Sequence, residues 1–202
     1  MGKKVCADMG SKEVHHIVGS APGEISEGMS ESHWLTCVNA SVARVNRKPD
    51  LWIITDQLFD TKKNANIEAL TQIEGRECRI LLIVIRSQSR AAIRRKLREL
   101  NIEYSVITFV SNIGRALICQ HYCGTRNYFK RFRPSNGVFA IIVSMLIASS
   151  CKTGSHRIMV SGINPLTINH FYDSGWGKRG HVQADQAAIE KIKEQKIPLT
   201  IL

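Results

Sequence analysis

Short hydrophobic runs alternate along the chain with longer stretches in which hydrophobic positions recur at helical spacing. The short runs have the length and composition of β-strands, and the longer stretches have the period of amphipathic helices. This alternation is typical of an α/β fold in which helices cover both faces of a mostly parallel sheet. We therefore predict one α/β domain built on such a sheet.

The strand predictions rest on hydrophobic runs bounded by polar or glycine-containing turns. The run 80–85 is hydrophobic at every position, as expected of a strand covered on both faces, and 104–109 looks similar. Both point to a buried, largely parallel sheet. The predicted strands are 16–19, 35–39, 51–56, 80–85, 104–109, 157–162 and 198–202.

Helices are predicted at 87–100, 138–150 and 185–194. The first of them carries Ile93 and Leu97 at helical spacing, with basic residues on the outer face. Residues 111–134 mix aromatic and basic side chains, and their pattern assigns no secondary structure.

The length and composition predict a single domain over residues 1–202. The 202 residues are 44% hydrophobic, which is enough for one substantial core. The longest apolar run, 138–149, is too short to cross a bilayer, and the first residues lack the apolar core of a signal peptide. We therefore expect a cytoplasmic protein whose six cysteines are reduced thiols.

The formal net charge of +11 predicts attraction for nucleic acid, acidic lipid headgroups or anionic substrates. Basic residues gather in the segments 86–98 and 126–133. The first group is either the solvated face of a helix or a partner-binding surface. A nucleic-acid-binding module that uses both segments is one hypothesis, and it predicts steeply salt-dependent binding to oligonucleotides.

The loop after the first predicted strand is a candidate ligand site. Its side chains are small, and Gly19 and Gly23 would allow a tight turn whose free backbone N–H groups contact a phosphate or a ribose. The loop is not a Walker loop, and it matches the dinucleotide fingerprint poorly. A plain structural turn explains it equally well.

Polar side chains stand at the ends of further elements. Asn39 and Asp56 end the second and third predicted strands, where the carboxyl edge of a parallel sheet borders a ligand crevice. Asn136 and Gly137 precede a predicted helix and would present N–H groups to an anion. Helix capping is the alternative explanation for these polar residues.

His181 lies between a glycine and a predicted helix, and its side chain is a candidate proton acceptor because imidazole titrates near neutral pH. A surface or capping role is the alternative. The group Cys119, His121 and Cys123 has no second ligand pair at zinc-finger spacing, so a zinc site is not expected. The pair His15-His16 is interpreted as incidental.

Several short motifs follow one another in a fixed order. The chain reads Ile-Val-Gly-Ser-Ala-Pro-Gly at 17–23, Cys-Val-Asn-Ala at 37–40, Ser-Asn-Gly-Val-Phe at 135–139, Arg-Ile-Met-Val-Ser-Gly-Ile at 157–163, Gly-His at 180–181, Ala-Ala-Ile-Glu at 187–190 and Ile-Pro-Leu-Thr-Ile-Leu at 197–202. In this order they resemble the bacterial lipooligosaccharide sialyltransferases of glycosyltransferase family 42. The resemblance covers about half of the chain and does not extend to 62–132.

The resemblance implies an inverting, metal-independent transfer of a sialic acid-like sugar from a CMP-activated donor, without a cofactor. It implies a Rossmann-like, variant GT-A-like domain with a small lid loop at about 164–180. His181 matches the general base, and Tyr172 matches a lid tyrosine that holds the leaving phosphate. The positions that match substrate-binding residues are Gly19, Ser20, Ala21, Pro22, Asn39, Asp56, Asn136, Gly137 and Gly162.

The partners that the resemblance implies are the CMP-sugar donor, an anionic glycan or glycolipid acceptor, the inner membrane face as a peripheral contact, and further copies in a homo-oligomer. Three sites depart from the family: Ser20-Ala21 replaces Asn-Gly, Asn136 replaces a serine, and Asp56 replaces an asparagine. A carboxylate at Asp56 would repel a donor sugar that bears a carboxylate, so the identity of the sugar stays open. The departures also keep a third hypothesis, a non-catalytic nucleotide-binding protein on the same fold.

Overall fold

The computed structural model describes residues 12–21, 25, 30–124, 134–150, 156–163, 182–194 and 198–202. In these ranges seven strands form one all-parallel sheet. The elements in chain order are β1 (Val14–Val18), β2 (Trp34–Val38), η1 (Asn39–Arg44), β3 (Leu51–Thr55), η2 (Asp56–Phe59), α2 (Asn64–Ile73), β4 (Glu77–Ile85), α3 (Arg90–Glu99), β5 (Glu103–Ser111), α4 (Asn112–Cys123), α5 (Asn136–Ser150), β6 (Arg157–Ser161), α6 (Val182–Lys193) and β7 (Leu199–Ile201).

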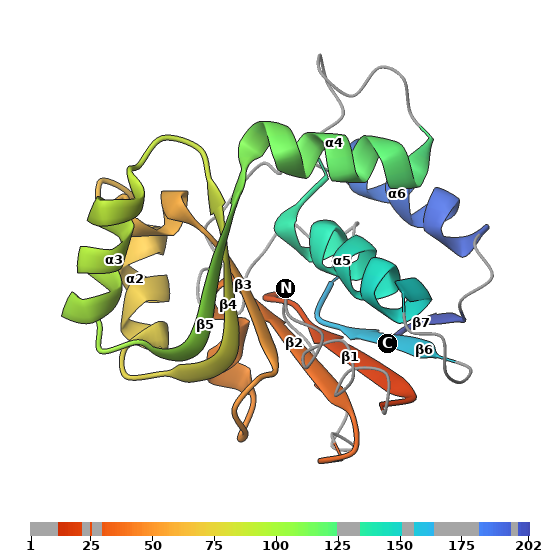
Figure 1. Ribbon diagram of the computed structural model, residues 1–202, viewed down its shortest axis with the longest axis horizontal. Coiled ribbons are helices and arrows are strands. Elements are labelled where there is room, and N and C mark those ends of the chain that lie inside the picture. The colour runs from red at the N-terminus through yellow and green to blue at the C-terminus, as the bar shows by residue number, and fades with distance from the viewer. Residues whose placement is uncertain are drawn as a thin grey trace.

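The strand order β5-β4-β3-β2-β1-β6-β7 reverses next to β1. Strands β2 to β5 lie one after another on one side of β1, whereas β6 and β7 lie on its other side (Figure 1). In open parallel sheets, such a reversal leaves a crevice at the carboxyl ends of the two central strands. The ends of β1 and β6 therefore mark the position where a ligand is expected.

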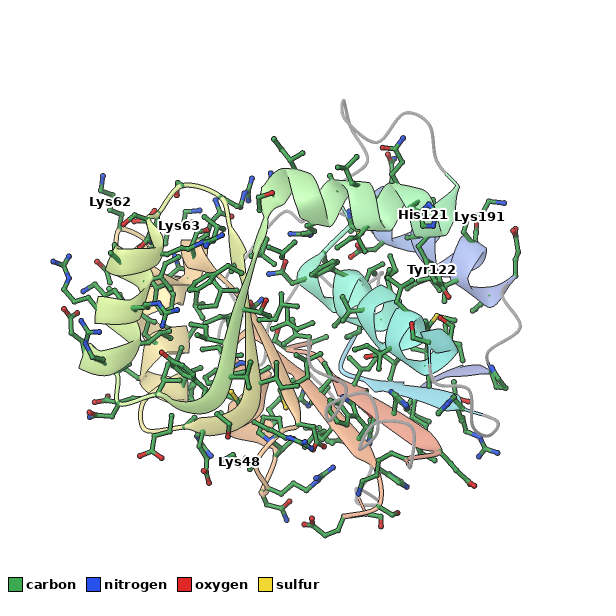
Figure 2. The ribbon with its side chains drawn as sticks, in the orientation of Figure 1. Lys48, Lys62, Lys63, His121, Tyr122 and Lys191 are labelled. Carbon is green, nitrogen blue, oxygen red and sulfur yellow. The ribbon has the colours of Figure 1, made fainter. Side chains whose placement is uncertain are left out.

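Two hydrophobic clusters, one on each face of the sheet, hold the helices in place. One cluster joins α4, α5 and α6 to the face that carries Ile17 and Val160. The other joins η1, η2, α2 and α3 to the face that carries Val18. Tyr122 of α4 lies over α5 (Figure 2), where its hydroxyl donates to the Met145 sulfur at 3.4 Å. Helix α5 packs against the sheet and two helices, which explains why it is hydrophobic nearly all round.

The predicted fold class is confirmed, because the chain forms a Rossmann-like α/β sheet with helices on both faces. Each predicted strand and helix is present, with ends that differ from the prediction by three residues at most. The pattern did not predict α2, α4 or the two short 3-10 helices. The lid loop expected at about 164–180 lies outside the described residues.

One prediction about the sheet is wrong. The strand at 104–109 was expected to be covered on both faces, but β5 is an edge strand with half-buried and exposed residues, among them Val106 at 44% exposure. Its hydrophobic composition is explained by the face it turns to the second cluster, which Tyr104, Ile107 and Phe109 join. Within the described part of the chain, no helix has both the length and the apolar content that a membrane span needs.

Candidate functional site

The sequence-predicted site residues that the structure describes all lie at the carboxyl edge of the sheet. Gly19 follows β1, Asn39 follows β2, Asp56 follows β3 and Gly162 follows β6. Asn136 is the first residue of α5, so this helix begins at the same edge, beside Asn39. Pro22, Tyr172 and His181 lie outside the described residues.

The loops after β1 and β6 are in direct backbone contact. They meet where the strand order reverses, a position we call the switch point. Gly19 N–H donates to the Ser161 carbonyl and Ala21 N–H to the Gly162 carbonyl, both at 2.8 Å. A Cβ atom on Gly19 would lie 2.3 Å from the Gly162 carbonyl oxygen, so only glycine fits there. The prediction that this loop offers free N–H groups is therefore wrong for Gly19 and Ala21, whose donors are already used.

Arg44, the last residue of η1, also binds the loop after β1. Its guanidinium donates to the carbonyls of Gly19 at 3.1 Å and of Ala21 at 2.5 Å. Burial lowers the pKa of Arg44, yet a guanidinium keeps its charge at neutral pH. A fixed positive charge therefore lies under the loop that begins at the end of β1. It adds to the attraction of this edge for an anionic ligand.

Ser41 joins the first two strands of the site. Its hydroxyl donates to the Val18 carbonyl at 2.6 Å and accepts from the Val38 N–H at 2.7 Å. The serine thus ties the last residue of β1 to the last residue of β2. This bond fixes how far Asn39 lies from the loop at Gly19.

Asn39 and Asn136 meet across 97 residues of sequence. Asn136 Nδ2 lies 3.3 Å from Asn39 Oδ1, where it can donate a hydrogen bond. Asn39 has a positive φ of 51°, a conformation that Asn tolerates better than most residues, and its carbonyl accepts from the buried Trp52 indole N–H at 2.7 Å. The tryptophan bond therefore holds the Asn39 backbone at the end of β2, and the Asn39 side chain meets Asn136 at the start of α5.

The start of α5 carries one buried side-chain oxygen, Asn136 Oδ1, whose hydrogen-bonding capacity is unused among the described residues. Ser135, just before the helix, donates its N–H to Asp185 Oδ1 of α6 at 2.6 Å, which anchors the turn. Gly137 packs on the Ile163 side chain, 3.1 Å from where a Cβ would be, so α5 approaches the β6 loop closely. A ligand donor would satisfy the amide oxygen, and the helix N-terminus favours an anion.

Among the described residues, the Asp56 side chain binds the loop between β4 and α3 rather than Asn39 or Asn136. Its carboxylate is fully buried, and Oδ2 accepts the N–H groups of Arg86, Ser87 and Gln88 at 2.8–3.0 Å. Its backbone carbonyl also accepts from the Gln88 side chain at 2.8 Å. The carboxylate therefore fixes the loop between β4 and α3. The sequence predicts either a ligand contact or a helix cap for Asp56, and this loop contact is neither.

His16 lies beneath the switch point and is not incidental. Its Nε2 lies 2.8 Å from Ser161 Oγ, a buried bond between β1 and the end of β6. Burial, followed by the charges of His33 and Arg47, lowers the pKa of His16 to about 4. Its neighbour His15 also has a pKa of about 4, again chiefly because of burial. Both imidazoles are therefore neutral at physiological pH. The hydrogen bond of His16 to Ser161 holds β1 to the end of β6.

Several site residues carry no signal that sequence reasoning could use. Arg44, Ser41 and Trp52 belong to no motif, because their partners are backbone groups brought close only by the sheet. Asp185 belongs to the family-like segment 180–190, but its bond to Ser135 depends on the packing of α6 against α5.

The thiols and metal-ligand groups add no second site. Cys37, Cys78, Cys119 and Cys123 are buried free thiols in the described ranges. Burial raises the pKa of Cys123 to about 11. No group of three or more His, Cys, Asp or Glu side chains that could hold a metal ion occurs among the residues that the structure describes.

The fold and the site define an α/β protein of Rossmann-like class whose candidate ligand site lies at the carboxyl edge of a parallel sheet, at the switch between β1 and β6. Comparison of the chain with known proteins found no matching family model, no matching curated protein and no matching solved structure.

Proposed function

We propose that this protein is a glycosyltransferase that moves a sialic acid-like sugar from a CMP-activated donor to an anionic glycan or glycolipid, with inversion and without a metal. The observation that carries the proposal is the contact of Asn39 with Asn136 at the switch point. Asn39 matches a donor-contacting position of the sialyltransferase family, whereas Asn136 stands where that family has a serine. Asn136 Oδ1 is buried and has no donor among the described residues.

The nucleotide explains these groups chemically. The exocyclic amine of cytosine, or a ribose hydroxyl, would supply the donor that Asn136 Oδ1 lacks. The phosphate of CMP would lie at the N-terminus of α5, where the helix dipole and the positive charge of Arg44 stabilise negative charge. The close backbone approach at Gly19 and Gly162 holds the loops after β1 and β6 together beside these groups.

In the proposed reaction, the acceptor hydroxyl oxygen attacks the anomeric carbon of the donor sugar while the bond from that carbon to the phosphate oxygen breaks. CMP leaves with the electron pair of that bond, and the hydroxyl proton passes to His181. Tyr172 would donate a hydrogen bond to the departing phosphate. The protein then has only to position the donor, stabilise the leaving group and accept one proton.

Asp56 is not assigned to the donor in this proposal. Its Oδ2 already accepts three N–H groups from the loop 86–88, which stabilise its negative charge, whereas Oδ1 is buried without a donor among the described residues. The repulsion expected between this residue and a sugar carboxylate is reduced accordingly. The net charge of +11 would attract the anionic acceptor and the inner membrane face, where we place this protein as a peripheral, cytoplasmic homo-oligomer.

A turnover assay tests the proposed reaction. The protein is incubated with a CMP-sugar and a mixture of anionic glycan acceptors, and both CMP release and the glycosylated product are measured. His181→Ala should lower kcat by about 100-fold or more, as expected for the loss of a general base, while CMP binding stays intact. His121→Ala, on the exposed side of α4, is the matched control. Full turnover in His181→Ala would remove that histidine from its role, and CMP binding without turnover of any CMP-sugar would favour the non-catalytic alternative.

A further inference from the structure

A row of arginines follows the outer edge of the sheet. Arg90, Arg94 and Arg98 recur every four residues on α3, so they form one stripe whose members are about 6 Å apart along the helix axis. The stripe faces β5, the edge strand. Two surface pockets, of about 320 and 380 Å³, lie one after the other between the stripe and the strand.

Two of these arginines are held close together without a counter-charge. The guanidinium carbons of Arg90 and Arg94 lie 5.3 and 5.5 Å from the centroid of the same ring, that of Phe109. Neither has an acidic partner among the residues that the structure describes. Like charges one helical turn apart repel each other unless an anion balances them.

On the opposite side of α3 the basic residues do have an acidic partner, unlike Arg90 and Arg94. Arg95 and Lys96 both contact Glu99, at 3.7 and 2.7 Å. The one acidic residue of the helix, Glu99, thus offsets part of the positive charge on the side that faces away from β5. The guanidinium groups of Arg90 and Arg94 lie over the Phe109 ring, and their planar N–H groups can donate to an external anion.

The groove continues along the strand with aromatic and polar groups. The first pocket is lined by Ile107, Thr108 and Phe109 besides the arginine pair. The second is lined by Arg98, Tyr104 and Ser105, together with the acidic Glu103, and reaches Lys48. Lys48 pairs with Glu77 at 2.8 Å and lies near the bottom of Figure 2, below Lys62 and Lys63. Among the strands that the structure describes, β5 has a neighbour on one side only, so its other edge also offers backbone donors and acceptors.

These features fit a chain-like polyanion better than a flat lipid surface. A bilayer meets a convex surface, whereas a single strand of nucleic acid can lie in a narrow groove beside a row of cations. The one-turn spacing of the arginines is similar to the interval between successive phosphates of an extended strand, and aromatic side chains offer surfaces for bases.

We propose that the groove between α3 and β5 binds single-stranded nucleic acid, with Arg90, Arg94 and Arg98 on successive phosphates and Tyr104 beside a base. This activity is independent of the proposed glycosyl transfer, because β5 is separated from β1 by three intervening strands. The groove and the carboxyl-edge site can therefore fail or succeed separately.

The test uses fluorescence anisotropy of the full chain with a labelled oligouridylate of about 12 nucleotides over a series of salt concentrations. Arg90→Ala/Arg94→Ala should weaken binding about tenfold at physiological salt and reduce the slope of log affinity against log salt by about 1.4, since each phosphate contact on a single strand contributes about 0.7. The control is Arg95→Ala/Lys96→Ala, which removes the same formal charge from the same helix and should change the affinity less than about twofold.

Three outcomes would overturn the proposal. One is equal weakening by both double variants, which would show that only net charge matters. A second is the absence of saturable binding to the oligonucleotide by the unmodified protein. A third is binding of anionic phospholipid vesicles that the groove variant abolishes while oligonucleotide binding persists. CMP titration of each variant, with circular dichroism to confirm folding, separates a failure of this proposal from a failure of the proposed glycosyl transfer.

Discussion

The Asp56 carboxylate holds one end of the loop that leads into α3. Three backbone N–H groups converge on Oδ2, and the side chain is fully buried. Charge-assisted bonds of this kind are about twice as strong as neutral ones, and a buried donor that loses its acceptor is costly. The residue therefore acts as a positioning residue for the loop.

Replacing this carboxylate should destabilise the fold. Asp56→Ala leaves three N–H groups without an acceptor, and we expect the free energy of unfolding to fall by at least about 2 kcal/mol. Urea unfolding followed by circular dichroism measures the change. Asp60→Ala, whose exposed carboxylate accepts a single N–H from Lys62, is the control and should cost less than about 1 kcal/mol. If the two variants are equally stable, Asp56 does not hold the loop.

At the scale of single elements, the contact between β1 and β6 contains two neutral imidazoles. His16 bridges to Ser161, while His15 packs edge-on against His156 with ring centroids 5.3 Å apart. Burial lowers the pKa of both His15 and His16 from the usual 6.5 to about 4. Protonation of either ring in the folded protein would place a charge between the strands.

The pH dependence of stability follows from these pKa values. Between pH 6.5 and 4 the unfolded chain binds protons that the folded one does not, so stability is fully present above pH 6.5 and is lost as the pH falls toward 4. Each histidine contributes at most about 1.4 kcal/mol per pH unit in this window. Urea unfolding from pH 4.5 to 7.5 should show the slope.

His16→Gln removes one titrating group and keeps a side-chain donor for Ser161. The variant should show a smaller slope than the unmodified protein, and the same change at the exposed His121 is the control. A slope that stays the same in His16→Gln would show that this imidazole is not the source of the acid sensitivity.

Most elements could be predicted from the sequence because their signals are local. Hydrophobic runs such as 80–85 are strands in any packing that covers both faces. The edge position of β5 could not be predicted, since strand order is set by contacts between distant segments. Helices α2 and α4 were missed because their hydrophobic positions are mixed with polar residues that weaken the helical period.

At the scale of the whole molecule, the candidate site depends on four separate parts of the chain. The sequence placed Gly19, Asn39, Asn136 and Gly162 at the ends of elements, and the switch point brings these ends together. It did not indicate that Gly19 and Ala21 use their N–H groups on the β6 loop, nor that Arg44 lies beneath them. Such contacts arise only after the sheet has formed.

Calorimetric titration of the protein with CMP tests the central claim most directly. We expect one saturable site per chain, with an affinity that falls about tenfold or more in Asn136→Ala because the amide of Asn136 contacts the base or ribose. Asn112→Ala is the matched control: this residue also follows a serine and begins a helix, α4, but lies outside the crevice. Asn112→Ala should bind CMP like the unmodified protein. Absence of CMP binding to the unmodified protein, or equal affinity in the two variants, would contradict it.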